Sequence, residues 1–215
     1  MSHAEDITFN GVTIKDIYAG HAMDLSGTRN VLIENCSFIG YRDRPDQSRN
    51  YAEAIQIDIQ TAGGFPAFGE HDNTVTRDVI VRNCFFGASG TANTKSWGCA
   101  IGHHAAVKDI FPSNIKILYN TIEGCTYRAI RVFKFRDVLI EGNTFKDCFG
   151  SINVGASSND SQAGDTILIN NNKFDGATGN VSPISINGVT GALTKNVKVI
   201  NNTFKNLNKV SGGVI

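Results

Sequence analysis

The sequence predicts an all-β fold, a parallel β-solenoid of about seven coils. Three observations predict it: one motif recurs along the chain, Ile or Val alternates with other residues inside each copy, and proline is scarce. The copies read ITFNGVTI from Ile7, VLIENCSF from Val31, VIVRNCFF from Val79, IKILYNTI from Ile115, VLIEGNTF from Val138, ILINNNKF from Ile167 and VKVINNTF from Val197. The shortest interval, 23 residues, is about one coil, so longer intervals are coils with inserted loops.

Each copy is predicted to be a strand with one buried face, because its side chains alternate with period two. The eighth position forms an apolar column that should stack inside the solenoid: Ile14, Phe38, Phe86, Ile122, Phe145, Phe174 and Phe204. The sixth position holds Val12, Cys36, Cys84, Asn120, Asn143, Asn172 and Asn202. A buried amide needs hydrogen-bond partners, so the four asparagines predict a ladder between coils. The two cysteines there act as small apolar fillers.

A second strand is expected in each coil. It reads AMDLS at Ala22, AIQID at Ala54, AIGHH at Ala100, AIRVF at Ala129, SINVG at Ser151 and PISIN at Pro183, with Gly213-Val214-Ile215 starting a seventh. The inward residues are Met23, Ile55, Ile101, Ile130, Ile152, Ile184 and Val214, so by alternation the residues after them point outward.

These columns resemble the right-handed parallel β-helix of the pectate-lyase-like superfamily, through the motif N-V-x-I-x-N-N-x-F and over nearly the whole chain. The resemblance implies a right-handed, single-stranded parallel β-helix. Members of that superfamily include polysaccharide lyases, glycoside hydrolases, uronan epimerases and phage tailspikes. The fold does not choose among these activities.

Length and composition indicate one domain, residues 1–215, with a long, narrow core. The 20 acidic and 20 basic residues balance, which gives no case for nucleic acid or an anionic membrane as partner, and no stretch is apolar enough to span a bilayer. The five cysteines are expected to be free thiols. No amphipathic helix caps either end, so we expect a fragment of a larger protein or a subunit of an oligomer such as a homotrimer.

The two parts of the chain differ, with loop-rich coils over residues 1–137 and plain coils over 138–215. Insertions are expected at 39–52, 61–76, 87–98 and 105–112, and long loops on a rigid scaffold often carry function. Their aromatic residues are Tyr41, Tyr51, Phe65, Phe68 and Trp97. These rings either stack on sugar faces or pack the loops onto the solenoid.

The outward columns of the second strand place ionisable residues together. One column holds Asp24, Gln56, Gly102 and Arg131, and the next holds Ser26, Asp58, His104 and Phe133. Since neighbouring coils lie about 4.8 Å apart, these residues should form one patch on the surface. His21, Glu53 and Arg128 share the position where the strand begins, and Gly102 leaves a gap for a ligand.

Each candidate also has a structural interpretation. Asp24 and Asp58 could be solvated surface carboxylates, and Arg131 could be only the ion-pair partner of Asp58. His103 falls in an inward column and is expected to be a core histidine. What favours a functional site is the convergence of acids, an amide, a histidine and an arginine on one stripe flanked by aromatic loops.

Two catalytic chemistries fit this stripe. Asp24 and Asp58, expected roughly 8 Å apart between Cα atoms, could serve as a glycosidase pair, with Glu53 as a third candidate acid. Alternatively, His104 as base and Arg131 as the group that neutralises a carboxylate could support uronan lyase chemistry. Substrate binding is assigned to residues around them: Gln56, Arg128, Trp97 and His21. No metal or cofactor is predicted, because no calcium-binding cluster and no zinc-finger spacing is present, although calcium remains compatible with a carbohydrate site.

We therefore expect a protein that binds and cleaves an extracellular or cell-surface polysaccharide, as a glycoside hydrolase or lyase of the tailspike type. The expected location is extracellular or in a virion tail. The alternative is a non-catalytic glycan-binding or structural module of a phage tail protein.

Overall fold

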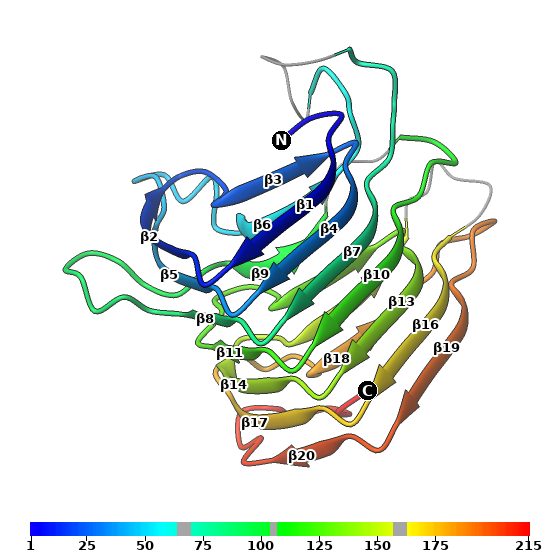
Figure 1. The fold of residues 1–215 in the computed structure, drawn as a ribbon. Coiled ribbons are helices and arrows are strands. Elements are labelled where there is room, and N and C mark those ends of the chain that lie inside the picture. The colour runs from blue at the N-terminus through cyan, green and yellow to red at the C-terminus, as the bar shows by residue number, and fades with distance from the viewer. Residues whose placement is uncertain (64–69, 104–106, 157–162) are drawn as a thin grey trace.

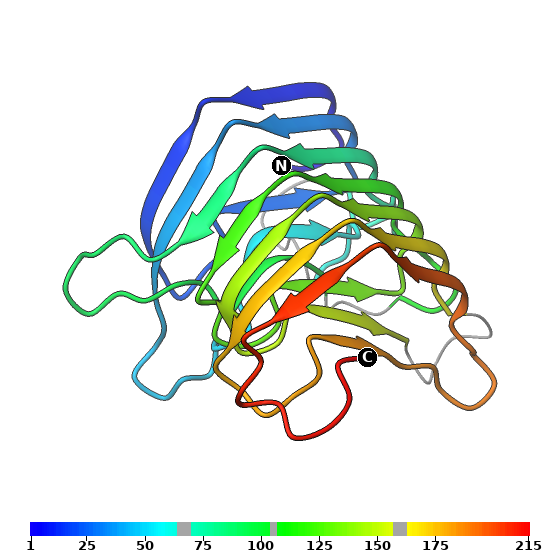
Figure 2. The ribbon, with the colours of Figure 1, turned by 90° about the horizontal axis from the view of Figure 1, so that it is seen from below.

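The computed structural model describes residues 1–63, 70–103, 107–156 and 163–215. Three parallel sheets run side by side along one axis, and the chain visits each sheet once per coil (Figures 1 and 2). The strands of the first sheet are β1 (Glu5–Asn10), β4 (Arg29–Glu34), β7 (Arg77–Arg82), β10 (Ser113–Leu118), β13 (Arg136–Glu141), β16 (Asp165–Asn170) and β19 (Lys195–Ile200). The all-β solenoid prediction is therefore confirmed as a parallel β-helix of about seven coils.

The other two sheets complete each coil. The second sheet contains β2 (Thr13–Tyr18), β5 (Ser37–Arg42), β8 (Phe85–Gly87), β11 (Thr121–Glu123), β14 (Thr144–Cys148), β17 (Lys173–Ala177) and β20 (Thr203–Lys205). The third sheet contains β3 (Met23–Ser26), β6 (Glu53–Asp58), β9 (Cys99–Gly102), β12 (Ile130–Phe133), β15 (Ile152–Gly155) and β18 (Ile184–Ile186). The strands of this third sheet are the second strands that the sequence predicted for the coils.

Each sequence repeat forms two strands, whereas one had been predicted. The chain bends at the fifth position of every copy, where the backbone is left-handed with φ between 53° and 70° at Gly11, Asn35, Asn83, Tyr119, Gly142, Asn171 and Asn201. Gly and Asn tolerate this conformation far better than other residues, which explains why they dominate the position. The bend separates the first sheet from the second.

The predicted apolar column stacks inside the solenoid. Ring centroids lie 5.0 Å apart for Phe38 and Phe86, 4.9 Å for Phe145 and Phe174, and 4.7 Å for Phe174 and Phe204. Ile122 continues the column between Phe86 and Phe145. Phe204, in the last coil, is only partly buried.

The asparagine ladder is also confirmed. The Nδ2 group of Asn120 donates to Oδ1 of Asn143 at 3.0 Å, and the same contact links Asn143 to Asn172 and Asn172 to Asn202, each at 3.0 Å. Each acceptor Oδ1 also receives a backbone N–H from the preceding asparagine, at 2.8 to 2.9 Å. The column therefore fastens four consecutive coils at the bend.

The end of the chain departs from the prediction. Residues Gly213 to Ile215 do not form a strand, although the Val214 carbonyl accepts the Ile184 N–H at 3.2 Å. The third sheet consequently has six strands where seven had been predicted. Within the described ranges, no helix is long and apolar enough to cross a membrane.

Candidate functional site

The predicted stripe lies on the outer face of the third sheet, with its register as expected. Asp24 pairs with Gln56, Gln56 pairs with Gly102, and Ser26 pairs with Asp58. Ile101 pairs with Ile130, which places Arg131 next to Gly102. Residues far apart in the sequence are thus neighbours, as the column argument requires.

The predicted exposure of the stripe is wrong at its centre. Glu53 and Asp58 are 0% exposed and Gln56 is 3% exposed. The insertion after β6 folds back through antiparallel pairing of Ile59 with Val75 and brings more polar groups against the strand. These groups bond to one another, so the stripe is an internal polar network with a half-buried rim.

Asp58 is fully buried in this network. Its carboxylate accepts the Gln56 Nε2 group at 2.8 Å and the Ile59 N–H at 2.7 Å. His103, predicted to be a core histidine, is indeed buried, with Nδ1 3.6 Å from Asp58 Oδ1. It lies beside this outward carboxylate because β9 ends at Gly102, where strand alternation stops. His104 lies outside the described residues.

Asp24 and Asp58 do not form an open pair of carboxylates. Asp24 is half-buried on β3, and its carbonyl accepts the N-terminal ammonium of Met1 at 2.6 Å. Asp58 is enclosed and hydrogen-bonded. A glycosidase needs both carboxyl groups to face the scissile bond, and this conformation does not provide that arrangement.

A second chain of contacts runs across the coils from Arg49 to Arg131. Arg49 Nη2 lies 2.9 Å from His21 Nε2, His21 Nδ1 lies 3.6 Å from Glu53 Oε2, and Arg131 Nη1 lies 3.4 Å from Glu53 Oε1. Arg131 is thus an ion-pair partner of Glu53, whereas the structural interpretation of the sequence had paired it with Asp58. We call Arg49, His21, Glu53 and Arg131 the rim network.

Gly102 makes this network possible. A Cβ added there would lie 2.9 Å from Arg131 Cβ and 3.2 Å from Glu53 Cγ. The gap predicted for a ligand is therefore filled by the protein's own ion pair. The absence of a side chain at Gly102 lets Glu53 reach across β9 to Arg131.

The contacts of His21 assign its protonation. A guanidinium can only donate, so His21 Nε2 accepts from Arg49. The ring hydrogen is then on Nδ1, which donates to the Glu53 carbonyl at 3.0 Å. His21 is neutral in this tautomer, so the Glu53 carboxylate is balanced by Arg131. The positive charge of Arg49 is then left over, and the rim network carries a net positive charge.

Aromatic rings flank the rim network at the surface. The Arg49 guanidinium lies 5.6 Å from the Tyr51 ring centroid, and the Arg131 guanidinium lies 5.7 Å from that of Tyr127. Tyr127 is 38% exposed, and the half-buried Arg128 beside it donates to the Ser182 carbonyl at 3.4 Å. The accessible part of the site is thus arginine and tyrosine, which are common anchors at protein interfaces.

Trp97 does not reach the surface, so its assignment to substrate binding is wrong. It is 0% exposed, its Nε1 donates to the Phe38 carbonyl at 3.1 Å, and it stacks on Tyr41 with centroids 5.1 Å apart. The large apolar area of both rings explains this packing. Phe65 and Phe68 lie outside the described residues.

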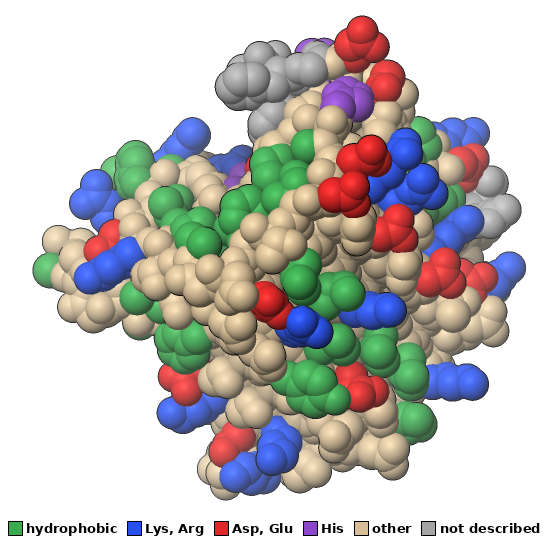
Figure 3. Space-filling model, viewed as in Figure 1, with side chains coloured by type: hydrophobic (Ala, Val, Ile, Leu, Met, Phe, Trp, Pro, Cys, Tyr) green, Lys and Arg blue, Asp and Glu red, His purple; other side chains and the backbone are tan. Residues whose placement is uncertain are grey.

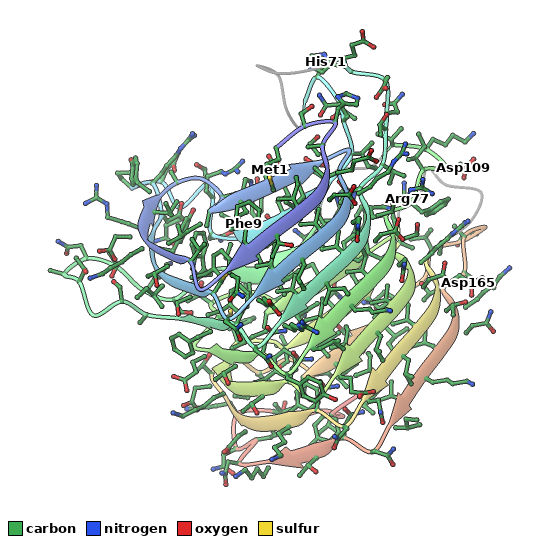
Figure 4. The ribbon with its side chains drawn as sticks, viewed as in Figure 1. Met1, Phe9, His71, Arg77, Asp109 and Asp165 are labelled. Atoms are coloured by element: carbon green, nitrogen blue, oxygen red, sulfur yellow. The ribbon has the colours of Figure 1, made fainter. Side chains whose placement is uncertain are left out.

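Charge elsewhere on the surface is mixed. The face of the first sheet shows acidic and basic side chains interspersed with apolar ones (Figure 3), and Arg77 and Asp165 lie along the same edge of that sheet (Figure 4). Among the residues that the structure describes, no group of three or more His, Cys, Asp or Glu side chains is placed to hold a metal ion.

Comparison with known families confirms the sequence resemblance at the level of the fold. Residues 1–204 match the family described as "Right handed beta helix region". The chain belongs to this family. The solenoid is therefore a right-handed parallel β-helix, as the pectate-lyase-like resemblance implied.

Similar proteins include a plasmin- and fibronectin-binding protein and a surface adhesin of known structure. The chain is 36% identical over 149 residues to "Plasmin and fibronectin-binding protein A" of Streptococcus pneumoniae (strain ATCC BAA-255 / R6), which covers 67% of this chain and 20% of that protein. A crystal structure of PfbA, a surface adhesin of Streptococcus pneumoniae, matches 98% of this chain and 52% of its own, with 26% identity and a TM-score of 0.82. A second PfbA structure has 24% identity and a TM-score of 0.64, over 96% of this chain and 66% of its own.

Proposed function

We propose that this chain is the β-helical binding module of a bacterial surface adhesin, located outside the cell, and that it binds a host protein such as fibronectin or plasmin. The observation that carries the proposal is the 36% identity to a protein named for binding those two partners. The match covers 20% of that protein, so binding by this segment is the hypothesis to be tested.

The contact surface in this proposal is the accessible part of the rim network together with the tyrosine and arginine side chains beside it. Tyr51, Tyr127, Arg128 and Arg131 present rings and guanidinium groups on a rigid scaffold, and rigid aromatic anchors lose little conformational entropy on binding. The net positive charge of the rim network favours an acidic segment of the partner. The buried acids beneath act as support, because Glu53 holds Arg131 in place.

Polysaccharide binding or cleavage at the same face is the second candidate function. The observation that favours it is the pair of surface tyrosines, Tyr51 and Tyr127, whose rings could stack on sugars. Burial of Glu53 and Asp58 argues against cleavage by these acids. Assignment to a virion tail and assembly as a homotrimer remain predictions that the relatives named above do not support.

The test is binding of the full chain to immobilised fibronectin and to plasmin, with an oligosaccharide panel and a reducing-end assay in parallel. We expect reversible binding to fibronectin or to plasmin. Replacing both Tyr127 by Ala and Arg128 by Glu should weaken it at least about tenfold, which corresponds to about 1.4 kcal/mol.

The matched control is Tyr119→Ala. Tyr119 is 55% exposed and lies at the bend between the first and second sheets, away from the rim. The Tyr119→Ala variant should bind as the wild type does. Wild-type binding to neither protein, together with sugar release, would favour the second candidate. Equal binding by the rim variant would move the contact surface elsewhere.

A further inference from the structure

The chain contains two Asn-Gly pairs, Asn10-Gly11 and Asn187-Gly188, and the residues of both pairs are exposed. In such a pair the main-chain nitrogen of the glycine can attack the asparagine side chain, because glycine has no Cβ to obstruct the approach. The reaction also requires that the asparagine amide and the glycine N–H are not held by other groups. The hydrogen bonds around each pair therefore decide which one reacts.

The first pair is fixed by contacts with the neighbouring coil. The Asn10 Nδ2 group donates to Glu34 Oε1 at 3.1 Å, and Asn10 Oδ1 accepts from Asn35 Nδ2 at 3.0 Å. The Gly11 N–H donates to the Glu34 carbonyl at 3.1 Å. Ring closure at this pair would break all of these hydrogen bonds.

The second pair follows β18, at the start of a hairpin in which Val189 pairs with Ala192. The Asn187 N–H donates to the Val154 carbonyl at 2.9 Å, so the main chain is fixed on its N-terminal side. Within the described part of the chain, neither the Asn187 side-chain amide nor the Gly188 N–H has a hydrogen-bond partner. The two groups that must react are thus available without the loss of any hydrogen bond of their own.

A hydroxyl group also activates the second pair. Thr194 Oγ1 donates to the Asn187 carbonyl at 2.8 Å. Hydrogen bonds polarise the groups that they join, so this contact withdraws electron density from the peptide group between Asn187 and Gly188. The Gly188 N–H then loses its proton more readily, and the deprotonated nitrogen is the nucleophile.

We propose that Asn187 is a site of spontaneous deamidation promoted by the Thr194 hydroxyl, and that Asn10 is protected by its hydrogen bonds. The deprotonated Gly188 nitrogen attacks the Asn187 Cγ atom, the bond from Cγ to the side-chain nitrogen breaks, and ammonia leaves after taking back the proton. Water then cleaves one of the two C–N bonds of the succinimide ring. Cleavage at Cγ gives aspartate, and cleavage at the main-chain carbonyl carbon gives isoaspartate. One water is consumed and one ammonia is released, with no change in oxidation state.

The modification changes the chain in two measurable ways. A carboxylate at Asn187 takes the formal net charge from zero to one unit negative. Isoaspartate also adds a methylene group to the main chain, between the N–H that bonds to Val154 and the hairpin that follows. Isoelectric focusing detects the first change, and enzymatic methylation of isoaspartate detects the second.

The experiment stores the full chain at mildly alkaline pH, folded in one sample and unfolded in guanidinium chloride in the other. Peptide mapping by mass spectrometry follows both Asn-Gly pairs over time. In the unfolded chain, Asn10 and Asn187 should deamidate at similar rates, because each is followed by glycine and neither is hydrogen-bonded. In the folded chain, Asn187 should deamidate while Asn10 stays intact.

Variants test the role of the hydroxyl. Thr194→Val should slow deamidation of Asn187 in the folded chain and leave the unfolded rate unchanged, whereas Thr194→Ser keeps a hydroxyl and should restore the wild-type rate. Thr190→Val, in the turn of the same hairpin, is the matched control and should react as the wild type does.

An intact Asn187 in the folded wild type, or loss of ammonia from Asn10 at an equal rate, would overturn the proposal. A folded Thr194→Val variant that deamidates as fast as the wild type, or faster, would overturn the role of the hydroxyl. The comparison of folded and unfolded wild type decides the site even if a variant fails to fold.

Discussion

At the scale of single residues, stability depends on side chains that repeat between coils. Asn143 both donates to and accepts from its ladder neighbours while 0% exposed. Asn143→Leu should therefore lower the free energy of unfolding by about 1–3 kcal/mol, since neighbouring amides lose partners inside the protein. Denaturant melts measure this. Asn187→Leu, at an exposed position, is the control and should change stability by less than about 0.5 kcal/mol. Equal melts for both variants would show that the ladder does not stabilise the fold.

Gly102 is the residue on which the rim network depends. Gly102→Ala would place a methyl group against Arg131 and Glu53, so it should cost about 1–3 kcal/mol of stability by overpacking. Under the proposed function, it should also weaken binding by displacing Arg131. Gly212→Ala is the matched control, because a Cβ there meets nothing within 4 Å. A melt of Gly102→Ala that coincides with the control would mean that the rim network tolerates rearrangement.

Tyr41 makes a pH-dependent contribution. Its hydroxyl donates to the Arg49 carbonyl at 2.8 Å, and burial raises the pKa of Tyr41 from 10.0 to about 12. Because the pKa is higher in the folded state, the stabilisation is complete below the unfolded-state pKa and is lost as pH rises toward the folded-state value. Tyr41→Phe should be less stable at neutral pH by about 0.5–1.5 kcal/mol, and the gap to the wild type should close in melts above the unfolded-state pKa. A constant gap would contradict this assignment.

At the scale of elements, the sequence predicted the strands of the first sheet and six of the third, but neither the division of each repeat into two strands nor the folding of the loops. Columns such as Phe38, Phe86 and Phe145 were predictable because strand spacing and alternation place in-register residues together. The bend at the fifth position was missed, although the Asn-Asn and Gly-Asn pairs there are typical of left-handed backbone. Alternation predicted that Asp58 points outward, but the burial of Asp58 and Glu53 depends on how insertions fold over the sheet, which periodicity does not encode.

The insertion at 88–98 shows how a loop is fastened to the solenoid. Tyr41 and Lys95 exchange backbone hydrogen bonds of 2.8 and 2.9 Å, and Trp97 fills the space beneath. Trp97→Ala should cost about 3–5 kcal/mol and expose this insertion to limited proteolysis. Trp97→Phe keeps a ring against Tyr41 but loses the Nε1 hydrogen bond, so it should cost less. If Trp97→Ala retained wild-type stability and protease resistance, the aromatic anchor would be unnecessary.

At the scale of the whole molecule, the rim network and the asparagine ladder occupy different parts of the solenoid. The rim network joins coils one, two and four, whereas the asparagine ladder runs from coil four to coil seven. The early coils are therefore joined by internal ion pairs, and the later coils hold their register through amides and stacked rings.

Solenoid coils contact only their neighbours, so stability should vary along the axis. Inward residues Ile115 and Ile117 of β10 are 0% exposed, whereas Val197 and Val199 of β19 are half-buried, and β19 has a neighbouring strand on one side only. Native-state hydrogen exchange should then show the highest protection in β7, β10 and β13 and lower protection in β1 and β19, because terminal coils open without disrupting the others. The measurement should be repeated at several protein concentrations. Protection of β19 equal to that of β10 at all concentrations would mean that the solenoid opens as one cooperative unit. Protection of β19 that rises with concentration would show that another copy of the chain covers its exposed edge, which is what the homotrimer prediction requires.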